Sequence, residues 1–128
     1  MMKQNMVLDL PLKKEWYEMI ESGIKTEEYR EIKPYWMKRL LEGVLPYFLR
    51  KIDNSCASFY CEKVDLLKDN YNYGSFLAKP YTHVRFRYGY TKRTMLFELD
   101  KITIGKGKTE WGAPDDKEVF ILKLGKRL

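Results

Sequence analysis

Apolar and polar positions along this chain repeat with two different periods, and these predict where strands and helices lie. Residues 6–10 are mostly apolar and predict a first strand, which Pro11 is expected to end because proline cannot donate a ladder hydrogen bond. Apolar residues at near-helical spacing follow at Leu12, Trp16, Met19 and Ile20. They predict a short helix that ends at Gly23, a residue suited to the left-handed cap.

A second strand and a second helix are expected directly after this glycine. The segment 26–32 is rich in residues that favour strands, and its alternation places Glu28 and Arg30 on the same face. Pro34 fits the first turn of a helix that runs up to Gly43. The apolar stripe of this helix, and the basic residues beside it, are Trp36, Leu40 and Leu41, with Lys38 and Arg39.

The last third of the chain is expected to consist mainly of strands. Residues 83–90 alternate strictly. The two faces are Val84, Phe86, Tyr88 and Tyr90 toward the core, and His83, Arg85 and Arg87 on the cationic side. Residues 93–104 and 118–124 complete the set of strands, and the glycines and proline of residues 105–114 indicate a loop between them.

The pattern is weakest between residues 44 and 79. Residues 57–64 are interpreted as a strand, and the polar, tyrosine-bearing residues 69–75 as a loop without regular structure. Cys56 and Cys61 are expected to be reduced thiols in or near that strand, because the chain shows no export signal. With His83 they are too few for a structural zinc site, so no metal is expected.

Length and element order predict one α+β domain over residues 1–128. Two early helices and several late strands favour a small, mostly antiparallel β-barrel with flanking short helices. No apolar run approaches the roughly 20 residues that cross a bilayer, and the first ten residues do not have the layout of a secretory signal. A cytoplasmic protein without a membrane segment is therefore expected, and its oligomeric state stays open.

The positive charge of the chain is concentrated in its C-terminal part. Residues 1–78 carry 12 Lys and Arg against 12 Asp and Glu, whereas residues 79–128 carry 12 against 6, which accounts for the whole formal charge of +6. Such asymmetry attracts phosphate-bearing partners over long distances, although many cationic surfaces only maintain solubility. Charge alone therefore permits a nucleic-acid partner without requiring one.

The most informative segment joins the first helix to the second strand. Gly23, Lys25, Glu28 and Arg30 match the G-x-K-x-x-E-x-R motif, and on these positions the chain resembles the ASCH domain family of the PUA-like superfamily. The flanking segments resemble that family as well, and the similarity covers most of the chain except residues 44–79, which correspond to a family-variable insert. These segments are residues 16–20, 33–36 and 120–125.

The resemblance implies a PUA-like barrel that binds RNA or a modified nucleotide in a cleft beside the motif, without a cofactor. A guanidinium suits phosphate, and a carboxylate can accept hydrogen bonds from a base edge. The residues expected to bind such a ligand are Lys25, Glu28, Tyr29, Arg30, Arg39, Arg85, Arg87 and Trp111. Base stacking is expected from Trp36, Tyr29 or Trp111 rather than from the alternating aromatics of residues 83–90.

Two enzymatic alternatives also follow from the resemblance. One superfamily member is an amidohydrolase that deacylates acetylated cytidine with a lysine, a threonine and a glutamate. The candidates here are Lys25, Thr26 and Glu28, although Glu28 occupies the position of that threonine and Thr26 lies next to the lysine. Metal-independent RNA cleavage is the other alternative, with His83 as a minor candidate for the base.

Two further interpretations involve no such chemistry. Glu28 and Arg30 could merely neutralise each other, with Lys25 solvated on the turn. The tyrosine-rich residues 69–81 could instead bind a protein partner.

Overall fold

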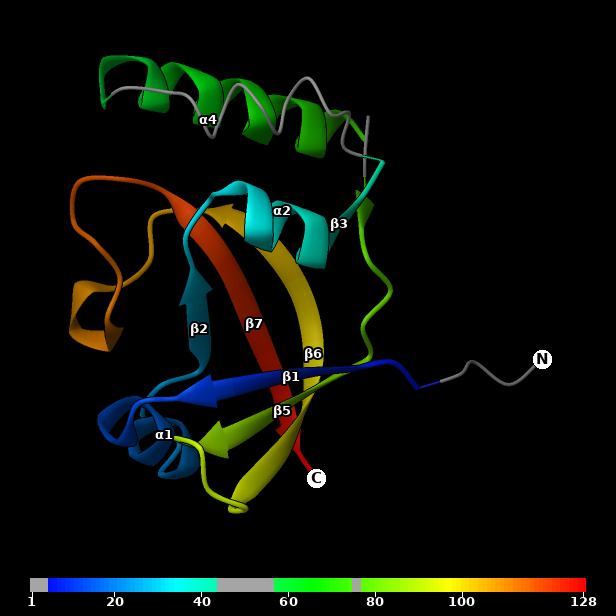
Figure 1. Cartoon of the computed structure of the whole chain (residues 1–128), viewed down its shortest axis with the longest axis vertical. Helices are drawn as coiled ribbons and strands as arrows, with labels where there is room; N and C mark the ends of the chain where they lie inside the picture. Colours follow the sequence, from blue (N-terminus) through cyan, green and yellow to red (C-terminus); the bar gives the residue numbers. More distant parts are fainter. Residues whose placement is uncertain (1–4, 44–56, 75–76) are drawn as a thin grey trace.

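The computed structural model describes residues 5–43, 57–74 and 77–128. Its elements in chain order are β1 (Val7–Leu12), α1 (Lys14–Glu21), β2 (Glu27–Arg30), α2 (Pro34–Leu40), β3 (Leu41–Glu42), α4 (Ala57–Tyr73), β4 (Leu77–Ala78), β5 (His83–Tyr88), β6 (Thr94–Gly105), the 3-10 turn η1 (Thr109–Trp111) and β7 (Val119–Arg127). Helices dominate the first part and strands the second, so the expected α+β class is confirmed (Figure 1).

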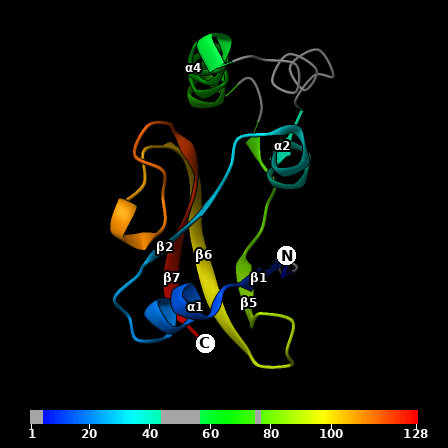
Figure 2. The same cartoon turned by 60° about the vertical axis from the view of Figure 1, so that its left-hand side comes forward.

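Five strands form one curled sheet in the order β1-β5-β6-β7-β2 (Figure 2). β1 runs parallel to β5, and the three other pairs are antiparallel. The sheet is therefore a mostly antiparallel half-barrel whose two edge strands are β1 and β2. We call the opening between these two edges the seam.

The main core lies on the concave side of the sheet. Alternate residues of each strand point to that side and supply its apolar side chains. β1 contributes Leu8, Leu10 and Leu12, and each of the three central strands of this sheet contributes at least two apolar side chains. The buried side chains from β5, β6 and β7 are Val84, Phe86, Met95, Phe97, Leu99, Ile102, Ile104, Phe120 and Leu122.

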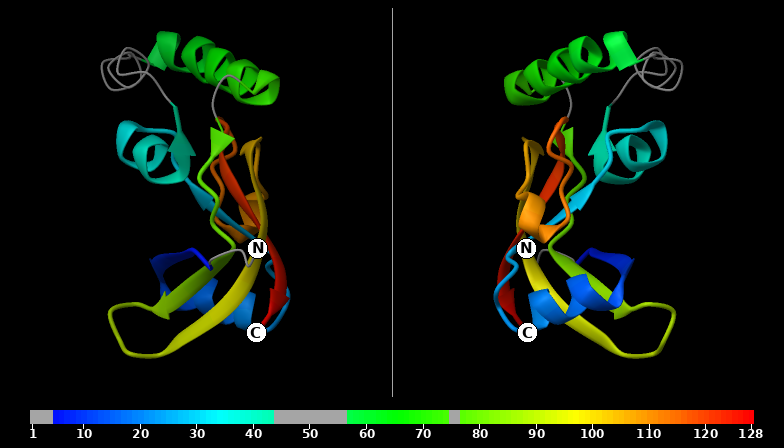
Figure 3. Two further views of the ribbon diagram at one scale, coloured as in Figure 1. Left: turned by 90° about the vertical axis from the view of Figure 1, so that its right-hand side faces the viewer. Right: turned by 90° about the vertical axis from the view of Figure 1, so that its left-hand side faces the viewer.

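In the described part of the chain, α1, α2 and α4 lie at the two ends of the sheet (Figure 3). α1 buries Tyr17 and Ile20, and the Tyr17 ring meets the Tyr88 ring edge to face at 5.1 Å between centroids. α2 buries Met37 and Leu40 near the opposite end, where α4 also lies. β3 follows α2 and β4 precedes β5, and these two strands pair with each other where the chain leaves for α4 and returns from it.

The boundary expected at Pro11 is wrong, because β1 continues through Pro11 to Leu12. β1 is an edge strand, and an edge strand tolerates a residue without an N–H when that position faces away from the partner strand. Leu12, expected on the first helix, is consequently a buried strand residue. α2 likewise ends at Leu40 rather than at Gly43, since the next two residues form β3.

The largest correction concerns residues 57–64, expected as a strand, and residues 69–73, expected as part of an irregular loop. They lie in α4, which runs from Ala57 to Tyr73. Leu67 is fully buried, and one turn later the Tyr71 hydroxyl donates to the Ile102 carbonyl at 2.6 Å. Contacts with the distant strand β6 thus stabilise a helix whose own sequence pattern is weak. Cys61 lies in α4, whereas Cys56 lies outside the described residues.

The strand over residues 83–90 is shorter than expected. β5 ends at Tyr88, Gly89 adopts a positive φ of 57°, and Tyr90 is exposed in the turn instead of facing the core. Val84 and Phe86 are buried as expected. Among the described helices, none combines the length and the apolar content that crossing a bilayer requires.

Candidate functional site

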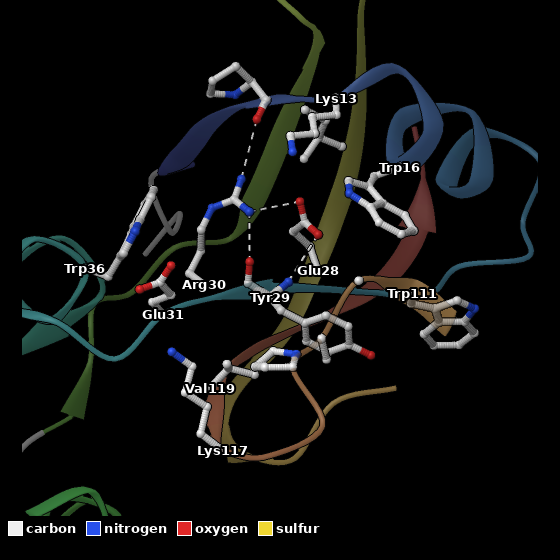
Figure 4. Close-up of a pocket in the computed structure, with 15 residues that line it drawn as sticks. Lys13, Trp16, Glu28, Tyr29, Arg30, Glu31, Trp36, Trp111, Lys117 and Val119 are labelled. Carbon is white, nitrogen blue, oxygen red and sulfur yellow. Dashed lines mark hydrogen bonds and ion pairs between the residues drawn. The ribbon is translucent and has the colours of Figure 1, made fainter. Parts of the chain in front are cut away.

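A cavity of about 610 Å³ lies at the seam, between β1 and β2 (Figure 4). We call it the seam cavity. It is lined by Pro11, Leu12, Lys13, Trp16, Glu28, Tyr29, Arg30, Glu31, Trp36, Trp111, Gly112, Ala113, Pro114, Lys117 and Val119. All three tryptophans of the chain are among these residues, although they come from α1, α2 and η1.

Local sequence explains how the motif reaches the cavity. Gly23 adopts a φ of 87°, which reverses the chain after α1 and leads it into β2. Within β2, Glu28 lies opposite Leu122 and Arg30 opposite Phe120, both of which are core residues. The expectation that Glu28 and Arg30 share a face is therefore confirmed.

Lys25, Glu28 and Arg30 form a continuous chain of charges beside the cavity. Glu28 is only 4% exposed, and its two oxygens lie 3.1 Å from Lys25 Nζ and 3.0 Å from an Arg30 nitrogen. Glu28 also accepts the Tyr29 N–H at 3.1 Å, and Arg30 donates to the Tyr29 carbonyl at 2.8 Å. Because β2 is an edge strand, these bonds satisfy backbone groups without the help of another strand.

Lys25 does not lie solvated on the turn, so that part of the simpler interpretation is wrong. It is 1% exposed, donates to the Trp111 carbonyl, and lies 4.9 Å from the ring centres of both Trp16 and Tyr29. Burial lowers the pKa of Lys25, and the attraction of Glu28 opposes this effect. Lys25 therefore supports the wall of the cavity and does not line it.

Residues 106–118, between β6 and β7, form a loop that we call the Trp111 loop. This loop covers Lys25 because it is anchored on Tyr29. The Tyr29 hydroxyl donates to Glu27 at 2.8 Å and accepts the Lys108 N–H at 3.0 Å. Burial of this phenol raises the pKa of Tyr29 well above its ordinary value. A Cβ at Gly107 would lie 2.5 Å from the Tyr29 ring, so the loop can approach this closely only with glycine there.

Gly112 brings the same loop against Trp16, and replacing it with alanine is expected to destabilise the domain. Its φ is 99°, and an added Cβ would lie 2.9 Å from the Trp16 indole. We expect Gly112→Ala to lower the free energy of unfolding by about 2 kcal/mol, measured by chemical denaturation.

Gly74→Ala is the matched control for this variant. Gly74 has a φ of 80° and no atom within 4 Å of an added Cβ, so only the backbone strain of about 1 kcal/mol is expected there. Equal losses in the two variants would show that Gly112 does not pack tightly on Trp16.

The structure brings together about half of the residues expected to bind a ligand. Glu28, Tyr29, Arg30 and Trp111 line the seam cavity. Arg39 lies next to it, with its guanidinium carbon 5.4 Å from the centre of the Trp36 ring.

The other expected residues lie elsewhere. Arg85 pairs with Asp9 at 3.4 Å, and Arg87 donates to the Thr91 carbonyl at 3.0 Å. Both are on β5 and outside the cavity lining, as is the exposed Thr26. The reason is geometric, because the cationic face of β5 lies opposite the buried face that carries Val84 and Phe86.

Several residues that line the cavity have no sequence pattern that predicts a ligand contact. The helical spacing of Trp16 predicts a core position, and the positions of Lys13, Glu31 and Lys117 match no motif. Trp36 is predicted only as a stacking candidate. The available signal was the position of Trp16 and Trp36 on the two helices that flank the motif.

Comparisons with known proteins leave the family of this chain open. No protein-family model matches the sequence, and neither curated proteins nor solved structures include a significant match. The resemblance to ASCH domains therefore stays a prediction. Within the described residues, no group of three or more His, Cys, Asp or Glu side chains is arranged to hold a metal ion.

Proposed function

We propose that this domain binds RNA or a nucleotide in the seam cavity, as an ASCH-type member of the PUA-like superfamily. The observation that carries the proposal is the convergence of all three tryptophans on one cavity that also contains Glu28 and Arg30. Indole rings stack on any nucleobase, which makes them suitable for ligands of this class. The residues of the motif supply the complementary polar groups.

The chemistry of the lining fits both parts of a nucleotide. Glu28 is an acceptor that can receive hydrogen bonds from amino or imino groups of a base, whereas the Arg30 fork suits a phosphate. Lys13 and Lys117 add positive charge to the lining. The volume of about 610 Å³ lies within the range of small-ligand sites, which is roughly 300–1,000 Å³.

The same geometry gives less support to catalysis. Lys25 is covered by the Trp111 loop and bonded to Glu28, and Thr26 is exposed outside the cavity lining. The three candidates for amide hydrolysis thus do not converge on one open position. His83, the candidate base for RNA cleavage, also lies outside the lining, with its Nδ1 2.7 Å from the Thr82 hydroxyl. We therefore propose binding without turnover.

Tryptophan fluorescence tests the proposal directly, because every tryptophan of the chain lines the cavity. We expect saturable quenching when the protein is titrated with single-stranded oligoribonucleotides or with ribonucleoside monophosphates. For RNA, log Kd is expected to rise with log salt by about 0.7 for each phosphate contacted. Arg30→Gln is expected to weaken binding about tenfold, the loss typical of one charge-assisted hydrogen bond.

Arg127→Gln is the control, because Arg127 is exposed at the end of β7 and lies outside the cavity lining. Lys13→Gln is a second cavity variant that leaves the bonds of Arg30 to β1 and β2 intact. No quenching by any of these ligands, or equal losses in the Arg30 and Arg127 variants, would refute the proposal.

A further inference from the structure

Two guanidinium groups share one tryptophan ring at one end of the seam cavity. The guanidinium carbons of Arg30 and Arg39 lie 5.2 and 5.4 Å from the centre of the Trp36 ring. Arg30 comes from β2, whereas Arg39 and Trp36 lie three residues apart on α2, where side chains at this spacing are neighbours. Tyr35 supports the ring edge to face at 4.8 Å. Two like charges are thus held against one ring by packing.

Backbone carbonyls of β1 hold both groups in place. Arg39 donates to the Asp9 carbonyl at 2.7 Å. Arg30 donates to the Pro11 carbonyl at 3.5 Å across the seam, a bond drawn in Figure 4. These carbonyls are two residues apart in a strand, so they point to the same side. A carbonyl orients a guanidinium without neutralising its charge, which keeps Arg39 preorganised for an anion. Arg30 is oriented in the same way and also pairs with Glu28, a carboxylate that it shares with Lys25.

Both guanidinium groups retain donors for such an anion. A guanidinium has five N–H groups, of which Arg30 uses three, for Glu28, Tyr29 and Pro11. Arg39 uses two, for the Tyr35 hydroxyl and the Asp9 carbonyl. Within the described residues, Arg39 has no carboxylate partner.

The charges around the cavity have a positive excess. Three cations and two carboxylates line it, and Arg39 adds a fourth cation beside the lining. The lining cations are Lys13, Arg30 and Lys117, and the lining carboxylates are Glu28, which is bonded to Arg30, and Glu31. Lys25 and Glu27, which also lie beside the lining, carry opposite charges. A dianionic group would balance most of this excess, and a phosphate monoester carries about −1.5 to −2 at neutral pH.

We propose that the Trp36 end of the seam cavity is a phosphate subsite formed by Arg30 and Arg39. This inference rests on the proposed function and adds that the ligand is phosphorylated, with its phosphate at Trp36 and its base toward Trp16 and Trp111. Figure 4 places these two tryptophans on the opposite side of the Glu28–Arg30 pair from Trp36. Trp36 has two guanidinium groups against it, whereas Trp16 and Trp111 each have one ammonium, Lys25 at 4.9 Å and Lys108 at 4.2 Å from the ring centres, so we assign the base to these two rings.

Paired ligands with and without a phosphate test the subsite. The protein is titrated with adenosine and AMP, with uridine and UMP, with inorganic phosphate, and with an oligoribonucleotide that has free hydroxyl ends. Each monophosphate is expected to bind at least about tenfold more tightly than its nucleoside. Arg39→Gln is expected to remove most of this preference by weakening monophosphate binding far more than nucleoside binding, whereas Arg39→Lys retains part of it because the charge remains without the planar fork.

Lys38→Gln is the matched control, because Lys38 is the exposed neighbour of Arg39 on α2. Thermal unfolding of each variant verifies that the compared proteins are folded. Equal affinity for nucleoside and monophosphate, or an unchanged preference in Arg39→Gln, would overturn the subsite while binding in the cavity still stands. If Arg39→Gln weakens binding of the hydroxyl-ended RNA as much as binding of the monophosphates, the phosphate in the subsite is one of the RNA backbone. If it weakens binding of the monophosphates alone, the ligand is a free nucleotide.

Discussion

Replacing Lys25 with methionine is expected to lower the free energy of unfolding by about 3 kcal/mol, even though a lysine-to-methionine change adds apolar character to a buried position. The loss has two physical causes. Glu28 keeps Arg30 but loses one of its two cations, and the Trp111 carbonyl loses its donor. Chemical denaturation of the purified variants measures the effect.

Lys14→Met is the control for this variant, because Lys14 is exposed on α1. A surface change of this kind is expected to alter stability by less than about 0.5 kcal/mol. If Lys25→Met were no more destabilising than Lys14→Met, Lys25 would not join β2 to the Trp111 loop as the structure indicates.

The stability difference between wild type and Lys25→Met is also expected to depend on pH. Burial lowers the pKa of Lys25 in the folded protein below its ordinary value of 10.5. Between that lowered pKa and 10.5, the unfolded chain binds more protons than the folded one, so the unfolding free energy rises with pH. Below the lowered pKa, both states are protonated and the contribution is constant. Tyr29, whose pKa burial raises, is present in both proteins, and so its contribution cancels.

Denaturation between about pH 7 and pH 10 tests this dependence. The advantage of the wild type over Lys25→Met should grow as the pH approaches 10.5. A difference that falls with pH would mean that the folded protein holds the Lys25 proton more tightly than the unfolded chain does.

Leu67→Ala is expected to cost about 3 kcal/mol of unfolding free energy, the loss typical of a fully buried leucine. Leu67 is 0% exposed and belongs to the same core cluster as the strands of the sheet. Its removal leaves a cavity between α4 and that core. Chemical denaturation measures the loss, and an unchanged slope against denaturant shows that only stability changed.

The adjacent residue gives a matched control, because Leu66 is 53% exposed in the same helix and the substitution is identical. Leu66→Ala is expected to change stability by less than about 0.5 kcal/mol. Similar effects at the two positions would show that α4 does not pack on the core through Leu67.

The sequence predicts the structure correctly where the local pattern is strong. The turn at Gly23, the helix that begins at Pro34 and the shared face of Glu28 and Arg30 all follow from neighbours within a few residues. The same holds for the buried Val84 and Phe86. Backbone geometry alone decides which side chains share a face.

The sequence does not predict the structure where contacts with residues distant in the chain override the local pattern. Residues 57–73 have mixed polar and aromatic character, and their helix depends on burial of Leu67 and on the bond from Tyr71 to Ile102. The Trp111 loop buries Lys25, which the charge pattern alone would place in solvent. Both outcomes depend on contacts between distant parts of the chain.

The sequence by itself thus determined the motif, its strand and the orientation of Glu28 and Arg30, because periods of two and 3.6 residues are properties of the local backbone. Only the tertiary structure decided that there is a cavity. The sheet curls without closing, so β1 and β2 leave a seam between them, and α1, α2 and the loop after β6 bring three tryptophans to it. Such an arrangement depends on how distant elements pack, which no local pattern records.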